Sequence, residues 1–98
     1  MNQEQLIQQL KAVSDANRLK LLAALKNGEC CVCDFVPLLQ ISQPAVSQQL
    51  KKLKDASIIQ ERKEGAWRYY RLVDSLSPVI QAVLDELEPI TIQSSCSK

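Results

Sequence analysis

The chain has 98 residues, of which 46% are hydrophobic and 23% charged, with two glycines and four prolines; this composition is typical of one globular domain rather than of a disordered or fibrous protein. A domain of this length buries only about 60–65% of its unfolded surface, so it gains stability by dimerising. There is no apolar run of about 18 residues and no basic, apolar leader at the N-terminus, so we expect a cytoplasmic protein without a membrane segment.

The charges are distributed unevenly along the chain. The net charge is only +1, which by itself indicates nothing about a nucleic-acid partner. Residues 43–72 hold seven cations and three anions, a local net charge of +4, whereas residues 73–97 hold four anions and no cation. The chain therefore has a basic middle and an acidic C-terminal part.

The first part of the chain predicts two helices. Hydrophobic residues recur at helical spacing between residues 6 and 13, which indicates a first helix that ends near Ser14. A second helix, from Ala16 to about Lys26, carries a wide apolar stripe that is typical of a buried helix. Asn27 and Gly28 then end this helix, because both residues tolerate the left-handed conformation of a helix C-terminus.

The next two helices form a predicted helix-turn-helix. A short helix from Asp34 to about Leu39 and a turn precede a longer helix, which Ser42 caps and which runs to about Ala56. The longer helix is apolar on one side and polar on the other, as suits a helix that enters the DNA major groove. A polar helix face is more often merely solvated, so the assignment to DNA binding depends on the neighbouring elements. The polar side carries Pro44, Ser47, Gln48, Lys51 and Lys52.

A β-hairpin follows this helix in the prediction. Residues Ile58 to Lys63 and Ala66 to Leu72 are rich in Ile, Trp and Tyr and alternate enough to be strands, with a turn at Glu64 and Gly65. Together with the preceding helices, a basic hairpin is typical of a winged helix-turn-helix, a mainly α fold with a β-hairpin wing. Tyr70 and Leu72 are assigned to the core, whereas Trp67 could contact DNA sugar or phosphate, or instead belong to the core or pack against the wing.

The last predicted helix runs from Ser75 to about Glu88. Its apolar stripe and that of the first helix exceed what the core needs, which predicts a homodimer formed through the N- and C-terminal helices. Such a dimer also has the two-fold symmetry of a palindromic operator. We expect residues 1–90 to form the DNA-binding and metal-sensing domain and residues 91–98 to form a flexible tail that carries Cys96.

Three cysteines lie close together in the segment ECCVCD, at positions 30, 31 and 33. In the cytoplasm they are thiols, and soft thiolates select soft ions. A structural zinc site usually takes four ligands, so three clustered cysteines fit a three-coordinate ion such as As(III) better, with Cd(II) or Pb(II) as alternatives. The cysteines could instead be small buried residues, but three in four consecutive positions are hard to explain by packing, because neighbours face different ways.

Four segments of the chain resemble, in order and spacing, the arsenic-responsive repressors of the ArsR/SmtB family. They span about three quarters of the sequence. The resemblance implies a homodimeric winged-helix repressor, not an enzyme and without an organic cofactor, that binds operator DNA when metal-free and is released when As(III) or Sb(III) binds. The segments are SDANRLKLLAAL (residues 14–25), ECCVCD (29–34), ISQPAVSQQLKKLKDA (41–56) and RKEGAWRYYRL (62–72).

The resemblance also implies the metal ligands. The family signature ELCVCD puts its two central thiols on Cys31 and Cys33, with Cys30 in the place of Leu and Val36 where a third cysteine is often found. The third ligand is therefore open between Cys30, Cys96 and solvent. Other members sense Zn(II) with histidines and carboxylates on the C-terminal helix, and the absence of histidine argues against that variant.

The spacing of the two thiols suggests a switch. Positions i and i+2 of an α-helix lie about 200° apart, so two helical cysteines cannot bind one ion together. We therefore expect metal binding to favour an unwound or re-angled start of the Asp34 helix, which shifts the recognition helix after it. In an extended segment, by contrast, the two side chains lie on the same side.

The DNA contacts follow from side-chain chemistry. Gln43, Ser47 and Gln48 are assigned to base edges, where glutamine can pair with adenine. The cations are assigned to phosphates, which gives an affinity that falls steeply with salt. These cations are Lys51, Lys52, Lys63 and Arg68.

Three alternatives stay open at this point. In a thiol redox sensor, Cys31 or Cys33 forms a disulfide with Cys96 or Cys30, and peroxide releases DNA without a metal. A small thiol enzyme or metal-trafficking protein is disfavoured, because there is no histidine to act as a base and a metal carrier needs neither the wing nor the cationic helix. A winged helix that binds only protein is disfavoured by the basic segment.

Overall fold

Local capping interactions define the two N-terminal helices. The computed structural model describes residues 1–92. Helix α1 (Gln3–Val13) begins with a capping box, in which the Asn2 side chain accepts from the Gln5 N–H at 2.8 Å and the Gln5 side chain accepts from the Asn2 N–H at 3.1 Å. Helix α2 (Ala16–Leu25) follows directly, and Gly28 ends the connection with a φ of 124°, which favours glycine. The end of α1 and both ends of α2 match the prediction to within about one residue.

The helix-turn-helix is present, but it is preceded by a strand that the sequence did not predict. Strand β1 (Cys30–Cys31) leads straight into α3 (Val32–Leu39), which begins two residues earlier than predicted. A two-residue strand is too short to show an alternating pattern. Helix α4 (Gln43–Asp55) begins as predicted after Ser42, whose Oγ accepts from the Ala45 N–H at 3.3 Å.

The wing is an antiparallel hairpin of β2 (Ile59–Glu64) and β3 (Trp67–Leu72). Its two-residue loop is Gly65 and Ala66, one position later than predicted, because Glu64 still pairs with Trp67. Gly65 has a φ of 61°, as the first position of such a loop requires. Strand β1 adds to the other edge of β3, so the sheet order is β1-β3-β2.

Helix α5 (Pro78–Glu86) is shorter than predicted at both ends. Its start is set by Ser77, whose Oγ accepts from the Ile80 N–H, and by Pro78, which fits a first helical turn. After α5 the chain passes back along α2, where the Ile90 N–H donates to the Ala23 carbonyl at 3.1 Å. Cys96 and most of the predicted tail lie outside the described residues.

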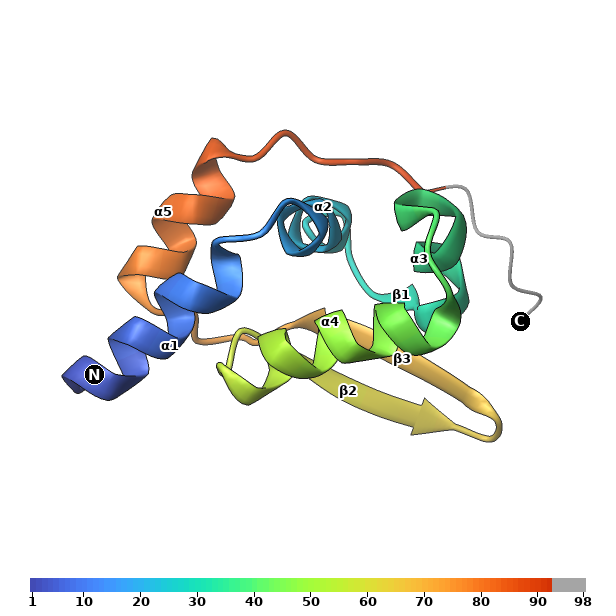
Figure 1. The fold of residues 1–98 in the computed structure, drawn as a ribbon, viewed down its shortest axis with the longest axis horizontal. Coiled ribbons are helices and arrows are strands. Elements are labelled where there is room, and N and C mark those ends of the chain that lie inside the picture. Colours follow the sequence, from blue (N-terminus) through green and yellow to red (C-terminus); the bar gives the residue numbers. More distant parts are fainter. Residues whose placement is uncertain (93–98) are drawn as a thin grey trace.

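The elements enclose one core (Figure 1), with α2 at its centre and α1 and α5 side by side at one end. Tyr70 is buried as predicted and Leu72 is half-buried, whereas Trp67 is 40% exposed and is not part of the core. Within residues 1–92, no helix is both long enough and apolar enough to cross a bilayer. The largest fully buried side chains are Phe35, Leu21, Leu22, Leu50, Leu53, Ile58, Ile80, Val46 and Cys31.

The core predicts a large stability difference between two neighbouring residues of α2. Leu21 is fully buried, so Leu21→Ala is expected to lower the free energy of unfolding by about 3 kcal/mol through lost burial and the cavity left behind. The exposed Lys20 is the matched control, and Lys20→Ala is expected to change it by less than about 0.5 kcal/mol. Urea denaturation at one fixed protein concentration measures both, and equal losses would contradict this assignment of the core.

Candidate functional site

The structure brings two of the four cysteines together at the start of α3. Cys31 is the N-cap residue, with φ −79° and ψ 150°, and Cys33 lies in the first turn. Because Cys31 has extended rather than helical backbone, the two sulfur atoms lie only 2.9 Å apart. The rule that an extended segment places positions i and i+2 on the same side holds here, while the unwinding or re-angling of the helix on metal binding stays a prediction. The two sulfur atoms are already side by side in the folded chain.

Within the described part of the chain, no third metal ligand is grouped with this pair. The Cys30 sulfur lies 3.6 Å from the Gly28 carbonyl oxygen, and neighbouring residues of a strand face opposite ways. Among residues 1–92, no three His, Cys, Asp or Glu side chains are grouped to hold an ion. Among residues 1–92 the described sulfur–sulfur contact is therefore that of Cys31 and Cys33. Cys33 is also disulfide-bonded in this structure, so the pair requires reduction before both sulfurs can bind an ion.

Asp34 is a buried residue that holds this segment and that the sequence reasoning missed. It is only 5% exposed, and its Oδ2 accepts from the Cys31 N–H at 3.0 Å. Its Oδ1 is buried and accepts no hydrogen bond from the described residues. The only sequence signal is its position three residues after the N-cap, where a side chain can accept from the N-cap N–H. Asp34 therefore fixes the backbone that carries the Cys31 sulfur.

The proposed DNA contacts lie on α4 and the wing, away from the core. Gln43, Gln48 and Lys51 are exposed and Ser47 is half-buried, while the opposite side of α4 is buried. A groove of about 420 Å³ lies between α4 and the wing. The structure brings four of the seven predicted residues to this groove: Ser47, Lys51, Lys63 and Arg68.

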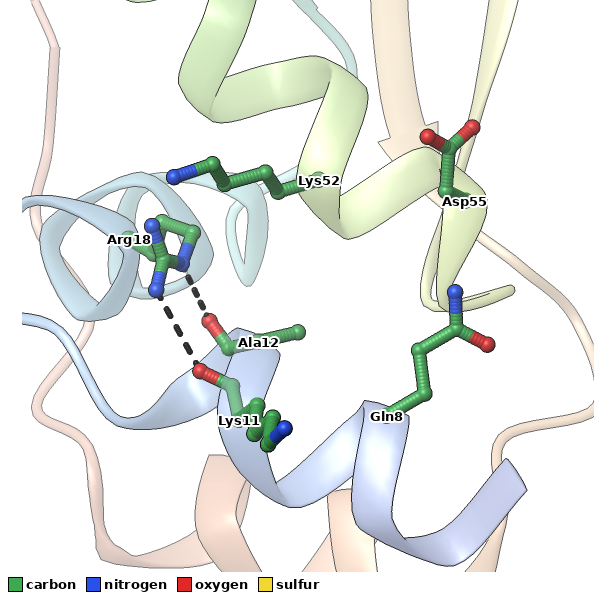
Figure 2. A pocket seen from close by; sticks show the side chains of 6 residues that line it. All are labelled: Gln8, Lys11, Ala12, Arg18, Lys52 and Asp55. Carbon is green, nitrogen blue, oxygen red and sulfur yellow. Dashed lines mark hydrogen bonds between the residues drawn. The ribbon is translucent and has the colours of Figure 1, made fainter. Parts of the chain in front are cut away.

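Lys52 is separated from that groove. It lines a different pocket of about 320 Å³, which lies between α4 and the N-terminal helices and also involves Lys11 and Arg18 (Figure 2). On a helix, positions 51 and 52 point about 100° apart, so only one of the two lysines can face the wing. Lys52 and the groove residues therefore face different sides of α4.

A half-buried carboxylate, that of Glu61, organises the groove between α4 and the wing. The Tyr70 hydroxyl donates to Glu61 Oε2 at 2.6 Å, and the Glu61 carboxylate lies 3.7 Å from Lys54 and 3.9 Å from Arg68. The Tyr70 hydrogen bond and these cations lower the pKa of Glu61, and burial together with Glu61 raises the pKa of Tyr70 to about 12. Lys54 and Glu61 were not singled out from the sequence, since their pairing joins a helix to a strand.

The thiol segment is tied directly to the wing. Cys31 pairs with Tyr69 in the sheet and Cys30 with Tyr70. Arg62 of β2 donates to both carboxylate oxygens of Glu29, at 2.6 and 3.1 Å, and its guanidinium lies 4.5 Å from the centre of the Tyr69 ring. These hydrogen bonds, and a further one to Glu64, raise the pKa of Arg62. The residues before and at Cys31 thus belong to the wing sheet.

Comparison with known proteins identifies relatives among transcriptional regulators. The model of the bacterial regulatory protein, arsR family, matches residues 15–61. An uncharacterised helix-turn-helix transcriptional regulator of Methanocaldococcus jannaschii is 42% identical over 79% of this chain and 88% of its own length. The arsenical resistance operon repressor of Escherichia coli is 36% identical over 82% of this chain and 69% of its own length.

A solved structure shows the same fold. HlyU from Vibrio cholerae superimposes with a TM-score of 0.73 at 29% identity, over 87% of this chain and 91% of its own. The reduced form of the same protein gives a TM-score of 0.72, over 84% and 83% of the two chains.

The lowered pKa of Glu61 predicts how acid affects stability. The folded protein keeps this carboxylate ionised at lower pH than the unfolded chain does, so its contribution is present above the ordinary value of 4.5 and is lost as the pH falls through the folded-state pKa. Glu61→Gln can still accept from Tyr70 but cannot ionise. We expect a weaker loss of unfolding free energy between about pH 6 and pH 3 in this variant. Urea denaturation across that range measures the free energy of unfolding, with Glu86→Gln, at an exposed position of α5, as control. An unchanged acid dependence in Glu61→Gln would refute it.

Proposed function

This chain belongs to the ArsR family of bacterial regulatory proteins, and from that membership we propose that it is a repressor that binds operator DNA as a homodimer and releases it when As(III) or Sb(III) binds. Members of the family are transcriptional regulators and not enzymes. The observation that carries the proposal is the 2.9 Å approach of two sulfur atoms at the N-terminus of the helix that precedes the recognition helix. The cytoplasm is the expected compartment, because it keeps these thiols reduced.

Exposed apolar residues support the dimer. Leu6, Ile7 and Leu10 of α1 are all exposed, Leu10 by 45%, although large aliphatic side chains are usually buried. Helix α1, which carries them, lies beside α5 at one end of the molecule (Figure 1). Val79, Val83 and Leu87 on α5 are only partly covered within one protomer. A two-fold axis at this end leaves α4 and the wing of both protomers open to DNA.

The surface of α4 and the wing supports DNA binding in the assigned roles. Gln43, Ser47 and Gln48 are proposed to contact base edges, and the cations Lys51, Lys63 and Arg68 to contact phosphates. Lys52 is proposed to reach phosphate on the other side of α4. In the free protein Lys51 lies 2.8 Å from Asp55 and Arg68 lies 3.9 Å from Glu61, so DNA competes with these carboxylates for both cations.

Two thiolates suit the proposed inducers chemically. Arsenous acid exchanges its hydroxyl groups for thiolates, and each exchange forms one As–S bond and releases one water that carries the thiol proton. Once Cys33 is reduced, Cys31 and Cys33 supply two such bonds from sulfurs that already lie side by side at the start of α3. We propose that the third position is taken by Cys30, by Cys96 or by solvent. The relatives named arsenical resistance operon repressors make the metalloids the first choice over Cd(II) or Pb(II).

We further propose that the wing transmits metal binding. Two thiolates that bind one As(III) ion lie farther apart than the present sulfur–sulfur contact of Cys31 and Cys33. Cys31 cannot move without its partners Tyr69 in β3 and Asp34 in α3. Any shift of β1 reaches the wing through the sheet and through the Glu29–Arg62 pair. A hundredfold loss of operator affinity requires only about 2.7 kcal/mol, which is small beside what a polythiolate site provides.

Titration of the operator complex with As(III) tests the inducer. We expect about a hundredfold loss of operator affinity in the reduced wild-type protein and almost none in Cys31→Ser or Cys33→Ser, because each serine removes one of the two soft ligands. Fluorescence anisotropy on promoter DNA measures it, with Sb(III), Cd(II) and Pb(II) in parallel.

The same titration separates the open points. A weaker As(III)-induced loss of operator affinity in Cys30→Ser or in Cys96→Ser identifies that cysteine as the third ligand. A wild-type loss in both variants indicates that solvent takes the third position. A full response of both Cys31→Ser and Cys33→Ser would contradict the proposed site.

A thiol redox switch is the second candidate function. It is favoured by the disulfide at Cys33 and by the structural similarity to HlyU, one structure of which is described as reduced. In this case peroxide alone lowers operator affinity and dithiothreitol restores it, with no requirement for a metalloid.

The salt dependence of DNA binding tests the phosphate contacts. Lys63 is exposed at the groove, so Lys63→Gln in both protomers is expected to reduce the slope of log Kd against log salt by about 1.8, since each lost phosphate contact contributes about 0.9. Lys20→Gln on α2 removes an equal charge away from the groove and serves as control. Equal slopes for Lys63→Gln and the wild type would argue against this contact.

A further inference from the structure

Arg18 connects α1 to the recognition helix through its buried guanidinium. Its Nε donates to the Ala12 carbonyl at 2.5 Å and its Nη2 to the Lys11 carbonyl at 3.2 Å (Figure 2). Its Nη1 donates to the Gln49 side chain of α4 at 2.7 Å. The nearest carboxylate, that of Asp15, lies 4.0 Å away. The guanidinium therefore joins α1 to α4 by hydrogen bonds, and its ion pair with Asp15 is long by comparison.

Gln9 makes a second connection of the same kind. It is buried although it is polar, and its Nε2 donates to the Ala56 carbonyl at the C-terminus of α4, at 3.0 Å. Its Oε1 accepts from the Ser77 hydroxyl at 2.6 Å, and Ser77 is the N-cap of α5. One side chain of α1 thus holds the end of the recognition helix and the start of α5.

We propose that Gln9 and Arg18 form a polar clamp that fixes the recognition helix relative to α1 and α5, and thereby sets the separation of the two recognition helices in the dimer. This inference rests on the proposed function, in which α1 and α5 carry the dimer axis and α4 contacts DNA. The clamp determines which half-site spacing the dimer accepts.

The chemistry of the clamp explains why it constrains direction as well as contact. Three of its acceptors are carbonyls in the last turns of α1 and α4, where helix geometry leaves carbonyls without partners inside the helix. A cation at the C-terminus of α1 is also favoured by the helix dipole. Apolar packing alone is non-directional, so it permits small rotations of α4 that these hydrogen bonds oppose.

The test uses duplexes that carry two identical half-sites, taken from the wild-type operator, at separations changed in single base-pair steps around one helical turn. Each step changes the distance by about 3.4 Å and rotates one half-site around the duplex. We expect the wild-type Kd to rise about tenfold for a shift of one base pair from the optimum, and only about threefold or less in Gln9→Met and Gln49→Met. Gln49 is half-buried and accepts the Arg18 hydrogen bond on α4, so Gln49→Met breaks this connection without removing the buried guanidinium. It is therefore preferred to Arg18→Met, which could prevent folding.

A neighbouring residue gives the control. Gln8 is exposed on the same helix, and Gln8→Met is expected to keep the wild-type spacing profile. A uniform loss of affinity at all spacings in Gln9→Met and Gln49→Met, or wild-type profiles in both, would overturn the clamp. Failure of the wild type to bind its promoter as a dimer would instead overturn the proposed function, so the two failures are distinguishable.

Discussion

The position of Cys31 constrains the rest of the structure. This residue ends a strand of the wing sheet and caps the first helix of the helix-turn-helix, with no linker between the two. Its backbone has only two free dihedral angles, and the pairing with Tyr69 and the hydrogen bond from its N–H to Asp34 restrain both sides of it. The site that carries the sulfur and the surface proposed to contact DNA therefore share one backbone.

Buried polar side chains hold the helices in defined relative positions. Hydrophobic burial accounts for the cohesion of a small domain, but it does not fix the angle at which one helix crosses another to within a few degrees. In this chain Gln9, Arg18 and Asp34 supply the directional contacts, and each one joins the start or end of a helix to a different element. Polar contacts also position the wing beside α4, since the Glu61 carboxylate of the wing lies between the Tyr70 hydroxyl and the Lys54 ammonium.

The sequence predicted the elements whose signals are local. Ser42 and Pro44 give the start of α4, Gly28 gives the end of α2, and the alternation of residues 58–72 gives the wing. Strand β1 could not be predicted, because two residues carry no period, and the N-cap role of Cys31 depends on that strand. At α4, the partners of Gln9 and Arg18 lie 47 and 31 positions away along the sequence, and no pattern along the chain indicates contacts of that range.

The brevity of β1 has an energetic consequence of its own. A ladder of two residues at the edge of a sheet contains few hydrogen bonds, so detaching it costs far less than unfolding the helices around it. Helices α2, α4 and α5 keep their own buried contacts when this edge separates. Local opening of this edge exposes its ladder to solvent without passage through the denatured state, whereas the Cys31 N–H stays protected by its hydrogen bond to Asp34 until the start of α3 also opens.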